Sequence, residues 1–254
     1  MTYCLGISIK EGIICLADGR VTTGNQISIA RKVSLHGPAD KRVCIMTSGM
    51  RSLRDKTIAY FDQEYSSKSI TTSSMLNVLE MYVNSLRRVE KEDRNALKAS
   101  NLSFNLHAII AGQIGNDLKP SMFLLYPEGN WIEVTERSPY ISIGSTAYGK
   151  PILDRMLTYE TPLSLALQIA YLSFDSTRVS SNDVDFPLDI MTFANDQRWR
   201  DMELEYDDVS GMRQWWNDQI KEIAINMKEG PWANCLLSGT GTKLSSTNNI
   251  FDLK

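Results

Sequence analysis

The chain has 254 residues, 43% of them hydrophobic, and its 27 basic and 30 acidic residues give a net charge of -3. This composition predicts a globular protein with a substantial core and gives no electrostatic reason to expect a nucleic-acid or membrane-surface partner. The longest apolar stretch, around residue 170, contains serines and a glutamine and falls short of the roughly 20 residues that span a bilayer. We therefore expect no membrane-spanning segment.

Cysteines and histidines are few and scattered. No two cysteines form a C-x-x-C pair, and the chain begins without the basic and apolar regions of a secretory signal. We therefore expect a cytoplasmic protein with reduced thiols at Cys4, Cys15, Cys44 and Cys235. His36 and His107 offer little material for a metal site or a catalytic triad, so we expect ordinary core or surface histidines and no metal or cofactor.

The first half of the chain predicts strands followed by helices. Residues 2–9 and 13–18 form an expected hairpin, and the unbroken apolar run from Ile13 to Ala17 indicates a strand that is covered on both faces. Two more strands are expected at 26–35 and 42–48. Helical spacing of apolar residues then predicts helices at 51–65 and 73–98.

The second half repeats this order. Thr161-Pro162 predicts a helix N-cap and first position, and a nearly all-round apolar helix should follow to residue 176. The other expected strands are 104–112, 120–126, 131–134, 139–144, 188–193 and 202–207, and the other expected helices are 148–158 and 209–228. Blocks of strands and helices favour an α+β fold in which two sheets lie between helical layers. We expect one domain over residues 1–230 and an irregular tail over 231–254 that could contact a neighbouring subunit.

A threonine directly follows the initiator methionine. Because Thr2 is small, we expect Met1 to be removed, which would place a hydroxyl and a free amine on one residue. An α-amine has a pKa of about 7.7–8.0 and can accept a proton at cellular pH, whereas a threonine hydroxyl needs a base before it can attack. Thr2 could therefore supply both nucleophile and base.

Such a site also needs a cation and a carboxylate that holds it. Asp18 ends the strand that should pair with the strand of Thr2, and Lys32 should share a strand face with the small residues Ser28, Ala30 and Ser34. The alternative is that Asp18 caps a turn and Lys32 is a solvated edge lysine. The spacing leaves both interpretations open.

An oxyanion site is also conceivable where a strand runs through Ser48-Gly49 into a helix. Backbone N–H groups at a helix N-terminus are unsatisfied, and glycine permits close approach of a substrate. Ser48 could equally be a simple helix cap. The later stretch SGTGTKLSS lacks the spacing of a phosphate loop, so we do not expect a nucleotide there.

Three segments carry a family resemblance: the run T-x-x-x-G-I-x-x-x-x-G-I-I-x-x-A-D-x-R-x-T-x-G that begins at Thr2, the pair Arg31-Lys32, and Thr47-Ser48-Gly49. Together they resemble proteasome β-type subunits, and the chain is most similar to the bacterial branch called Anbu. The resemblance extends over roughly residues 2–195. It implies the four-layer αββα fold of N-terminal nucleophile hydrolases.

The resemblance also implies roles for single residues. Thr2 would be the nucleophile with its amine as base, Asp18 and Lys32 the charged pair, and Gly49 the N–H donor to the oxyanion. Ser145 would hydrogen-bond near the amine, Arg20 would be a structural ion-pair partner, and Thr47 would line a small or polar specificity pocket. The family's D-x-x-S-G-G motif is missing, because the equivalent stretch reads SSNDVDFPLD. Asp183 or Ser181 could replace it.

Three functions are compatible with this resemblance. The first is a threonine peptidase that hydrolyses peptide bonds, and the others are a non-catalytic, self-assembling proteasome-like scaffold and an amidase for a small-molecule amide. The trio of Thr2, Asp18 and Lys32 favours a hydrolase, because a scaffold has no physical need for it. The resemblance implies a homo-oligomer, either a ring or an open spiral, whereas no feature of the sequence identifies an ATPase partner.

Overall fold

The computed structural model describes residues 2–23, 26–68 and 71–227. The chain divides into two compact units, one that ends at Asp208 and one that begins at Val209. Met1, Cys235 and the expected irregular tail at 231–254 lie outside the described residues. Within the described part, no helix is both long and apolar enough to cross a bilayer.

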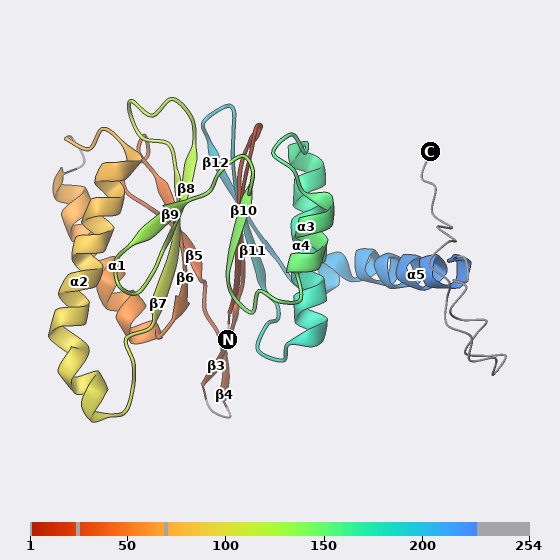
Figure 1. Ribbon diagram of the computed structural model, residues 1–254, viewed down its shortest axis with the longest axis horizontal. Coiled ribbons are helices and arrows are strands. Elements are labelled where there is room, and N and C mark those ends of the chain that lie inside the picture. Colours follow the sequence, from red (N-terminus) through yellow and green to blue (C-terminus); the bar gives the residue numbers. More distant parts are fainter. Residues whose placement is uncertain (1, 24–25, 69–70, 228–254) are drawn as a thin grey trace, which may run out of the picture. The chain divides into compact units, whose positions relative to one another are not determined.

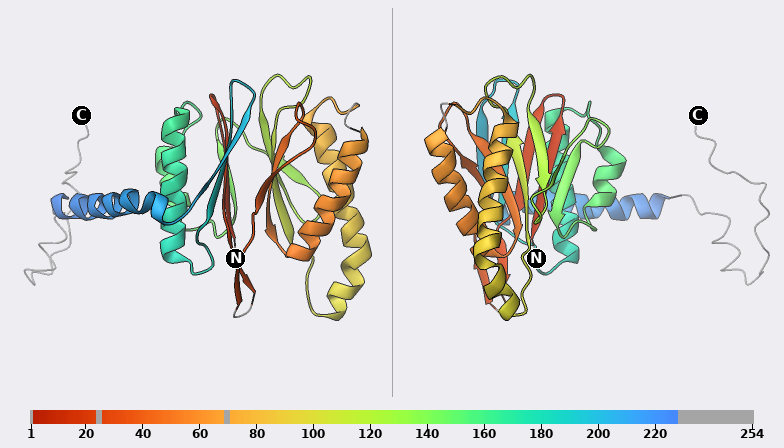
Figure 2. Two further views of the ribbon diagram at one scale, coloured as in Figure 1. Left: turned by 180° about the vertical axis from the view of Figure 1, so that it is seen from behind. Right: turned by 60° about the vertical axis from the view of Figure 1, so that its left-hand side comes forward.

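The first unit has four layers, with two five-stranded antiparallel sheets face to face between two pairs of helices (Figures 1 and 2). One sheet has the order β10-β1-β2-β11-β12, formed by Tyr140–Gly144, Tyr3–Ile9, Gly12–Asp18, Leu188–Ala194 and Trp199–Leu204. The other has the order β5-β6-β7-β8-β9, formed by Val33–His36, Val43–Gly49, Leu106–Gly112, Ser121–Leu125 and Trp131–Glu133. This arrangement confirms the predicted αββα fold.

The helices cover the outer faces of the two sheets. Helices α1 (Arg51–Lys68) and α2 (Met75–Ala99) bury Phe61, Tyr65 and Tyr82 against β6, β7 and β8. Helices α3 (Lys150–Met156) and α4 (Leu163–Ser180) lie on the other side, where α4 packs on β1 and β2 (Figure 1). A separate ribbon of β3 (Arg20–Thr23) and β4 (Gln26–Ile29) extends from the end of the sandwich at which β2 ends.

Strand β2 lies in the middle of its sheet and is buried over its whole length. Ile13, Cys15 and Ala17 belong to the core between the two sheets, where they meet Met46 and Met191. The residues that alternate with them face α4, because successive side chains of a strand point to opposite faces. The prediction of a strand covered on both faces is confirmed.

The prediction of one strand over residues 26–35 is wrong. Residues 26–29 pair with β3, residues 30–32 have no strand, and residues 33–36 form an edge strand of a sheet. Specific contacts break the strand, since the N–H of Ala30 donates to the carbonyl of Gly19 and Arg31 forms an ion pair with Asp189. Lys32 therefore leaves the predicted strand face.

The predicted cap of α4 is also wrong. Pro162 occupies the N-cap position, and the hydroxyl of Thr161 instead accepts a hydrogen bond from the N–H of Thr158. The first free N–H of the helix, at Leu163, donates to the Glu11 carboxylate at 2.8 Å. A carboxylate from the β1–β2 turn thus takes the place of the cap, where it also interacts favourably with the positive end of the helix dipole.

A smaller difference concerns the last strand, whereas the described thiols agree with the prediction. Strand β12 lies about three residues before the predicted segment 202–207. Cys4, Cys15 and Cys44, the cysteines among the described residues, are buried and form no disulfide.

In the second unit, α5 (Ser210–Asn226) has no buried residue, and it exposes the apolar side chains of Met212, Trp215, Ile220 and Ile223.

Two leucines on α2 test this description of the core. Leu79 is 1% exposed and packs in the core between the helices and the sheet, whereas Leu76 on the same helix is 56% exposed. Leu79→Ala should lower the free energy of unfolding by about 2–5 kcal/mol because it leaves a cavity. Leu76→Ala should change it by less than about 0.5 kcal/mol. Equal costs in urea unfolding would contradict the placement of α2.

Candidate active site

Thr2 lies at the start of β1 and is 9% exposed. It lines a cavity of about 260 Å³ whose wall also includes Lys32, Thr47 and Gly49. These residues come from the start of β1, the segment between β4 and β5, and the end of β6. The fold therefore brings four of the predicted site residues to one cavity.

The pairing of β1 with β2 brings Asp18 to the start of the chain. Cys4 is opposite Ala17, and at the next position the N–H of Tyr3 donates to Asp18 Oδ1 at 2.8 Å. Asp18 is fully buried, and the N–H of Tyr3 holds its carboxylate in place beside Thr2.

Lys32 completes a buried ion pair. Its Nζ is 2.7 Å from Asp18 Oδ1 and also donates to the carbonyl of Arg20 at 2.5 Å. Burial raises the pKa of the Asp18 carboxyl, while the charge and hydrogen bond of Lys32 and the N–H of Tyr3 oppose that increase. With its side chain only 4% exposed, Lys32 brings a positive charge to the wall of the cavity at a fixed position.

Ser145 supports Thr2 from the other side of β1. Its N–H donates to the carbonyl of Thr2 at 2.7 Å, and its hydroxyl oxygen is 3.5 Å from that of Ser181. Both serines are buried. The preceding Gly144 has a φ of +90°, and a Cβ there would lie 1.8 Å from the carbonyl oxygen of Thr2, so this close approach requires glycine. Ser181, one of the two candidates for the missing motif, therefore lies beside Ser145.

Arg20 is placed as an ion-pair partner. Its Nη1 is 3.1 Å from Asp185 Oδ2, in the segment that leads into β11, and its carbonyl accepts the hydrogen bond from Lys32. The N–H of the preceding Gly19 donates to the carbonyl of Pro187 at 2.7 Å. These contacts tie the end of β2 to the start of β11 and so fix the position of Asp18.

Gly49 and Thr47 also line the cavity of Thr2. Gly49 has a φ of +134°, and a Cβ there would lie 2.1 Å from the carbonyl oxygen of Asn105, so a side chain cannot be accommodated. Thr47 is 4% exposed, and its N–H donates to the carbonyl of Lys32 at 3.2 Å. Helix α1 begins two residues after Gly49.

A second cavity of about 330 Å³ adjoins the first, and both are lined by Lys32, Thr47 and Arg54. Arg31 lines it too, and its Nε and Nη2 contact Asp189 at 3.0 Å and Asp201 at 2.9 Å. Burial raises the pKa of the Asp189 carboxyl to about 6, against the opposing charge of Arg31. Thr47 therefore lies between the cavity of Thr2 and a neighbouring space large enough for a side chain.

His36 is a core histidine, as expected, and both of its ring nitrogens have partners. His36 is 9% exposed and makes hydrogen bonds through both ring nitrogens, to Ser34 at 2.7 Å and Asp62 at 2.8 Å. The sequence signal for the first contact is Ser-x-His, since positions two apart on a strand share a face. Asp62 is on a different element, so nothing in the local sequence pointed to it.

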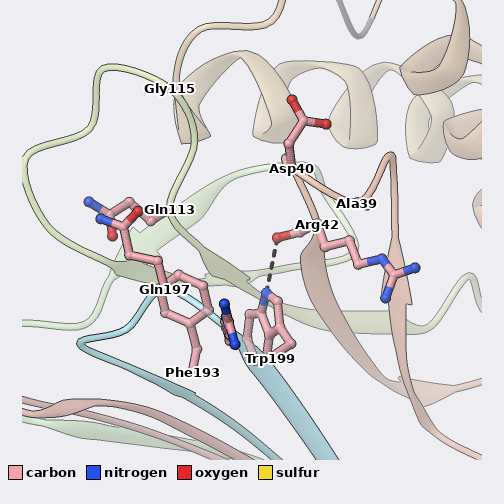
Figure 3. A pocket seen from close by; sticks show the side chains of 9 residues that line it. Ala39, Asp40, Arg42, Gln113, Gly115, Phe193, Gln197 and Trp199 are labelled. Carbon is pink, nitrogen blue, oxygen red and sulfur yellow. Dashed lines mark hydrogen bonds between the residues drawn. The ribbon is translucent and has the colours of Figure 1, made fainter.

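A larger cavity, about 450 Å³, lies between the two sheets near the start of β6 and the end of β11 (Figure 3). There the indole N–H of Trp199 donates to the carbonyl of Arg42, and the ring of Phe193 lies next to the indole. The described residues that line it include no serine, threonine, cysteine or histidine. Because β6 runs about 20 Å from Val43 to Gly49, this cavity is far from Thr2 and lacks a nucleophile.

Asp189 gives a test of the electrostatics beside Lys32. An unfolded chain releases the proton of Asp189 near pH 4, whereas the folded protein keeps it up to about pH 6. The folded state binds more protons in this range, so the free energy of unfolding decreases as the pH rises from about 4 to about 6. Asp189→Asn removes the loss. The free energy of unfolding of the variant minus that of the wild type should therefore increase from pH 4 to pH 7 in urea titrations. A difference that is independent of pH would contradict the raised pKa.

Comparisons with known proteins agree with this fold. The family model for proteasome subunits matches residues 2–186. The fold is similar to Anbu (Gly-1) mutant from Hyphomicrobium sp. strain MC1, with 26% identity, a TM-score of 0.82 and coverage of 91% of this chain and 99% of that one. It is also similar to the helical assembly of the Anbu complex from Pseudomonas aeruginosa, with 27% identity, a TM-score of 0.82 and the same coverage.

A third solved structure, Anbu (ancestral beta-subunit) from Yersinia bercovieri, has 27% identity and a TM-score of 0.80, with coverage of 90% of this chain and 98% of that one. No curated protein matches the chain by sequence. The family match covers well over half of the chain, and the structural matches cover nearly all of it. The chain therefore belongs to the proteasome subunit family, and its structure matches those of the Anbu branch.

Proposed function

We propose that the chain is a threonine-type N-terminal nucleophile hydrolase that cleaves peptide bonds after Met1 has been removed. The observation that carries this proposal is that Thr2 shares a cavity with Lys32, which the buried Asp18 holds at 2.7 Å. Burying an ion pair is costly because both charges lose their hydration. The pair is useful in a site where negative charge develops during the reaction, because Lys32 can stabilise that charge.

In the proposed reaction, the amine of Thr2 takes the proton of its own hydroxyl, and Oγ1 attacks the substrate carbonyl. The N–H of Gly49 holds the oxyanion, and the charge of Lys32 stabilises the negative charge that develops on the oxygens. The tetrahedral intermediate collapses to an ester on Thr2, and the leaving amine takes the proton. The α-amine of Thr2 then takes a proton from water, which hydrolyses the ester and restores Thr2.

The other residues have positioning roles in this proposal. Asp18 fixes Lys32, and the ion pair of Arg20 with Asp185 fixes the end of β2, which carries Asp18. Ser145 holds the backbone of Thr2 and places its hydroxyl next to that of Ser181. Thr47 faces the adjoining cavity of about 330 Å³, where the side chain next to the scissile bond would lie. A small or polar side chain suits Thr47 best.

Two other functions remain as alternatives. An amidase for a small-molecule amide would use the same residues, and competition between peptide and small amide electrophiles for Thr2 distinguishes it from a peptidase. A non-catalytic scaffold would assemble in the same way without needing the charged pair. The peptidase is preferred because the two adjoining cavities provide room for more than a single small group.

Variants at Thr2 test the proposed nucleophile. Thr2→Ala should reduce cleavage of fluorogenic peptides to background, because other hydrolases lose on the order of 10⁶-fold in kcat without their nucleophile. Thr2→Ser keeps a hydroxyl and an amine on one residue and should retain measurable activity. Thr22→Ala removes a different hydroxyl from the same cavity and should stay within a fewfold of the wild type. Full activity of Thr2→Ala would rule out the proposal.

We also propose that the protein is a homo-oligomer and that its C-terminal part, including α5, contributes contacts between copies. One similar protein is described as a helical assembly. Support from this chain comes from α5, where Met212, Trp215, Ile220 and Ile223 form an exposed apolar stripe at helical spacing. An isolated chain would leave this stripe in water.

Light scattering tests the assembly. The wild type should have a mass that is a multiple of 28.7 kDa. The double variant Trp215→Glu with Ile223→Glu should shift it toward that of a single chain, since two charges replace the apolar stripe. As a control, Gln214→Glu with Lys221→Glu changes the other side of the same helix and should leave the mass unchanged. A monomeric wild type, or no effect of the first pair, would contradict the proposal.

A further inference from the structure

Next to the threonine cavity, three side chains form a continuous hydrogen-bonded chain. Ser34 Oγ is 2.7 Å from His36 Nε2, and His36 Nδ1 is 2.8 Å from Asp62 Oδ1. Ser34 and His36 are two positions apart on β5, opposite Ile45 and Val43, on the sheet face that α1 covers. Helix α1 supplies Asp62, so one strand and one helix position the three groups.

The order of the hydrogen bonds determines the direction in which a proton can move. A carboxylate only accepts, so the contact with Asp62 places the proton of neutral His36 on Nδ1. The lone pair on Nε2 then faces the hydroxyl of Ser34. This is the arrangement in which histidine acts as a general base toward a serine, with the carboxylate orienting the ring and stabilising the imidazolium.

The chain of hydrogen bonds ends in a space that a substrate can enter. Ser34 lines the cavity of about 330 Å³, together with the apolar side chains of Ile58 and Ala59. His36 lies behind it, with only 9% of its surface exposed, and its ring packs edge-on against Phe61. The base is thus shielded from water while the hydroxyl faces the cavity.

The charges around the cavity suit the chemistry of an acyl transfer. Arg31, Lys32 and Arg54 line it and supply positive charge for an oxyanion formed after attack by Ser34. Asp55 and Asp62 line it as well, and Arg54 is paired with Asp55 at 2.6 Å. The volume is at the lower end of the range of about 300–1,000 Å³ for small-molecule sites. A short acyl group fits between Ile58, Ala59 and Thr47.

We propose that Ser34 is a second nucleophile, and that Ser34, His36 and Asp62 form an esterase site for carboxylic esters of short acyl chains. Nε2 of His36 takes the proton of Ser34, and Oγ bonds to the carbonyl carbon. The alcohol leaves with the proton from His36, and an acyl-serine remains. Water then gives one proton to His36 and its oxygen to the acyl carbon. The bond from that carbon to Ser34 Oγ breaks, Oγ takes the proton back from His36, and the carboxylic acid leaves.

This activity is independent of the proposed function. It uses neither the hydroxyl nor the amine of Thr2, so it requires no removal of Met1. A protein without threonine peptidase activity can therefore still have the esterase activity, and a protein with peptidase activity can lack the esterase activity. The two proposals fail separately.

Covalent labelling of the full-length protein provides the test. Diisopropyl fluorophosphate forms a bond between phosphorus and the oxygen of an activated serine as fluoride leaves. With this probe, peptide mapping by mass spectrometry should locate an adduct on Ser34 in the wild type and also in Thr2→Ala. The labelling rate should exceed that of the exposed Ser28 by at least about 100-fold. In the Thr2→Ala background, where Thr2 cannot contribute, hydrolysis of p-nitrophenyl acetate should persist and should disappear when Ser34→Ala is added.

Two variants distinguish a catalytic chain from a structural link between β5 and α1. Asp62→Asn and His36→Ala should each lower the labelling rate of Ser34 by about 100-fold or more, and thermal unfolding shows whether each variant is folded. Asp62→Asn preserves the size of the side chain and serves if His36→Ala does not fold. An unlabelled Ser34 in the wild type would overturn the proposal, as would a rate that is unchanged in folded Asp62→Asn.

Discussion

The structure of the site depends on the buried ion pair between Lys32 and Asp18. Neither group could be buried alone, because an unpaired charge in the interior costs several kcal/mol. The pair therefore requires that β1 and β2 stay in register, that Arg20 present its carbonyl, and that the chain leave β-structure at residues 30–32. The wall of the Thr2 cavity is built around this pair, and the same segment carries Arg31 into the neighbouring cavity.

The elements that were predictable are those with strong local patterns. The unbroken apolar run of β2 and the periodic apolar residues of α2 identified a buried strand and an amphipathic helix, and both were confirmed. The break at residues 30–32 was not predictable, because the contacts that cause it come from Gly19 and from the distant Asp189. The cap of α4 failed for the same reason, since Glu11 is 152 positions away along the chain.

The site was predictable to a similar extent. The proximity of Asp18 to Thr2 followed from hairpin pairing, and the position of Gly49 followed from a strand that ends before a helix. The sequence could not show that Ser181, 36 positions from Ser145, would lie beside it. Nor could it show that a helix would bring Asp62 to His36. Both contacts depend on the tertiary packing of elements that no local sequence pattern relates. The contact of Asp62 with His36 forms a Ser-His-Asp cluster, which the small number of histidines gave no reason to expect.

In the proposed mechanism, Thr2 combines nucleophile and base beside the Asp18–Lys32 pair. A peptide epoxyketone tests it directly, because this electrophile closes a ring only with a hydroxyl and a free amine on the same residue. For protein expressed with its natural start, we expect mass spectrometry to show loss of Met1 and one adduct that joins both groups of Thr2. A chain that keeps Met1 and stays unmodified, or an adduct on another residue, would contradict the account.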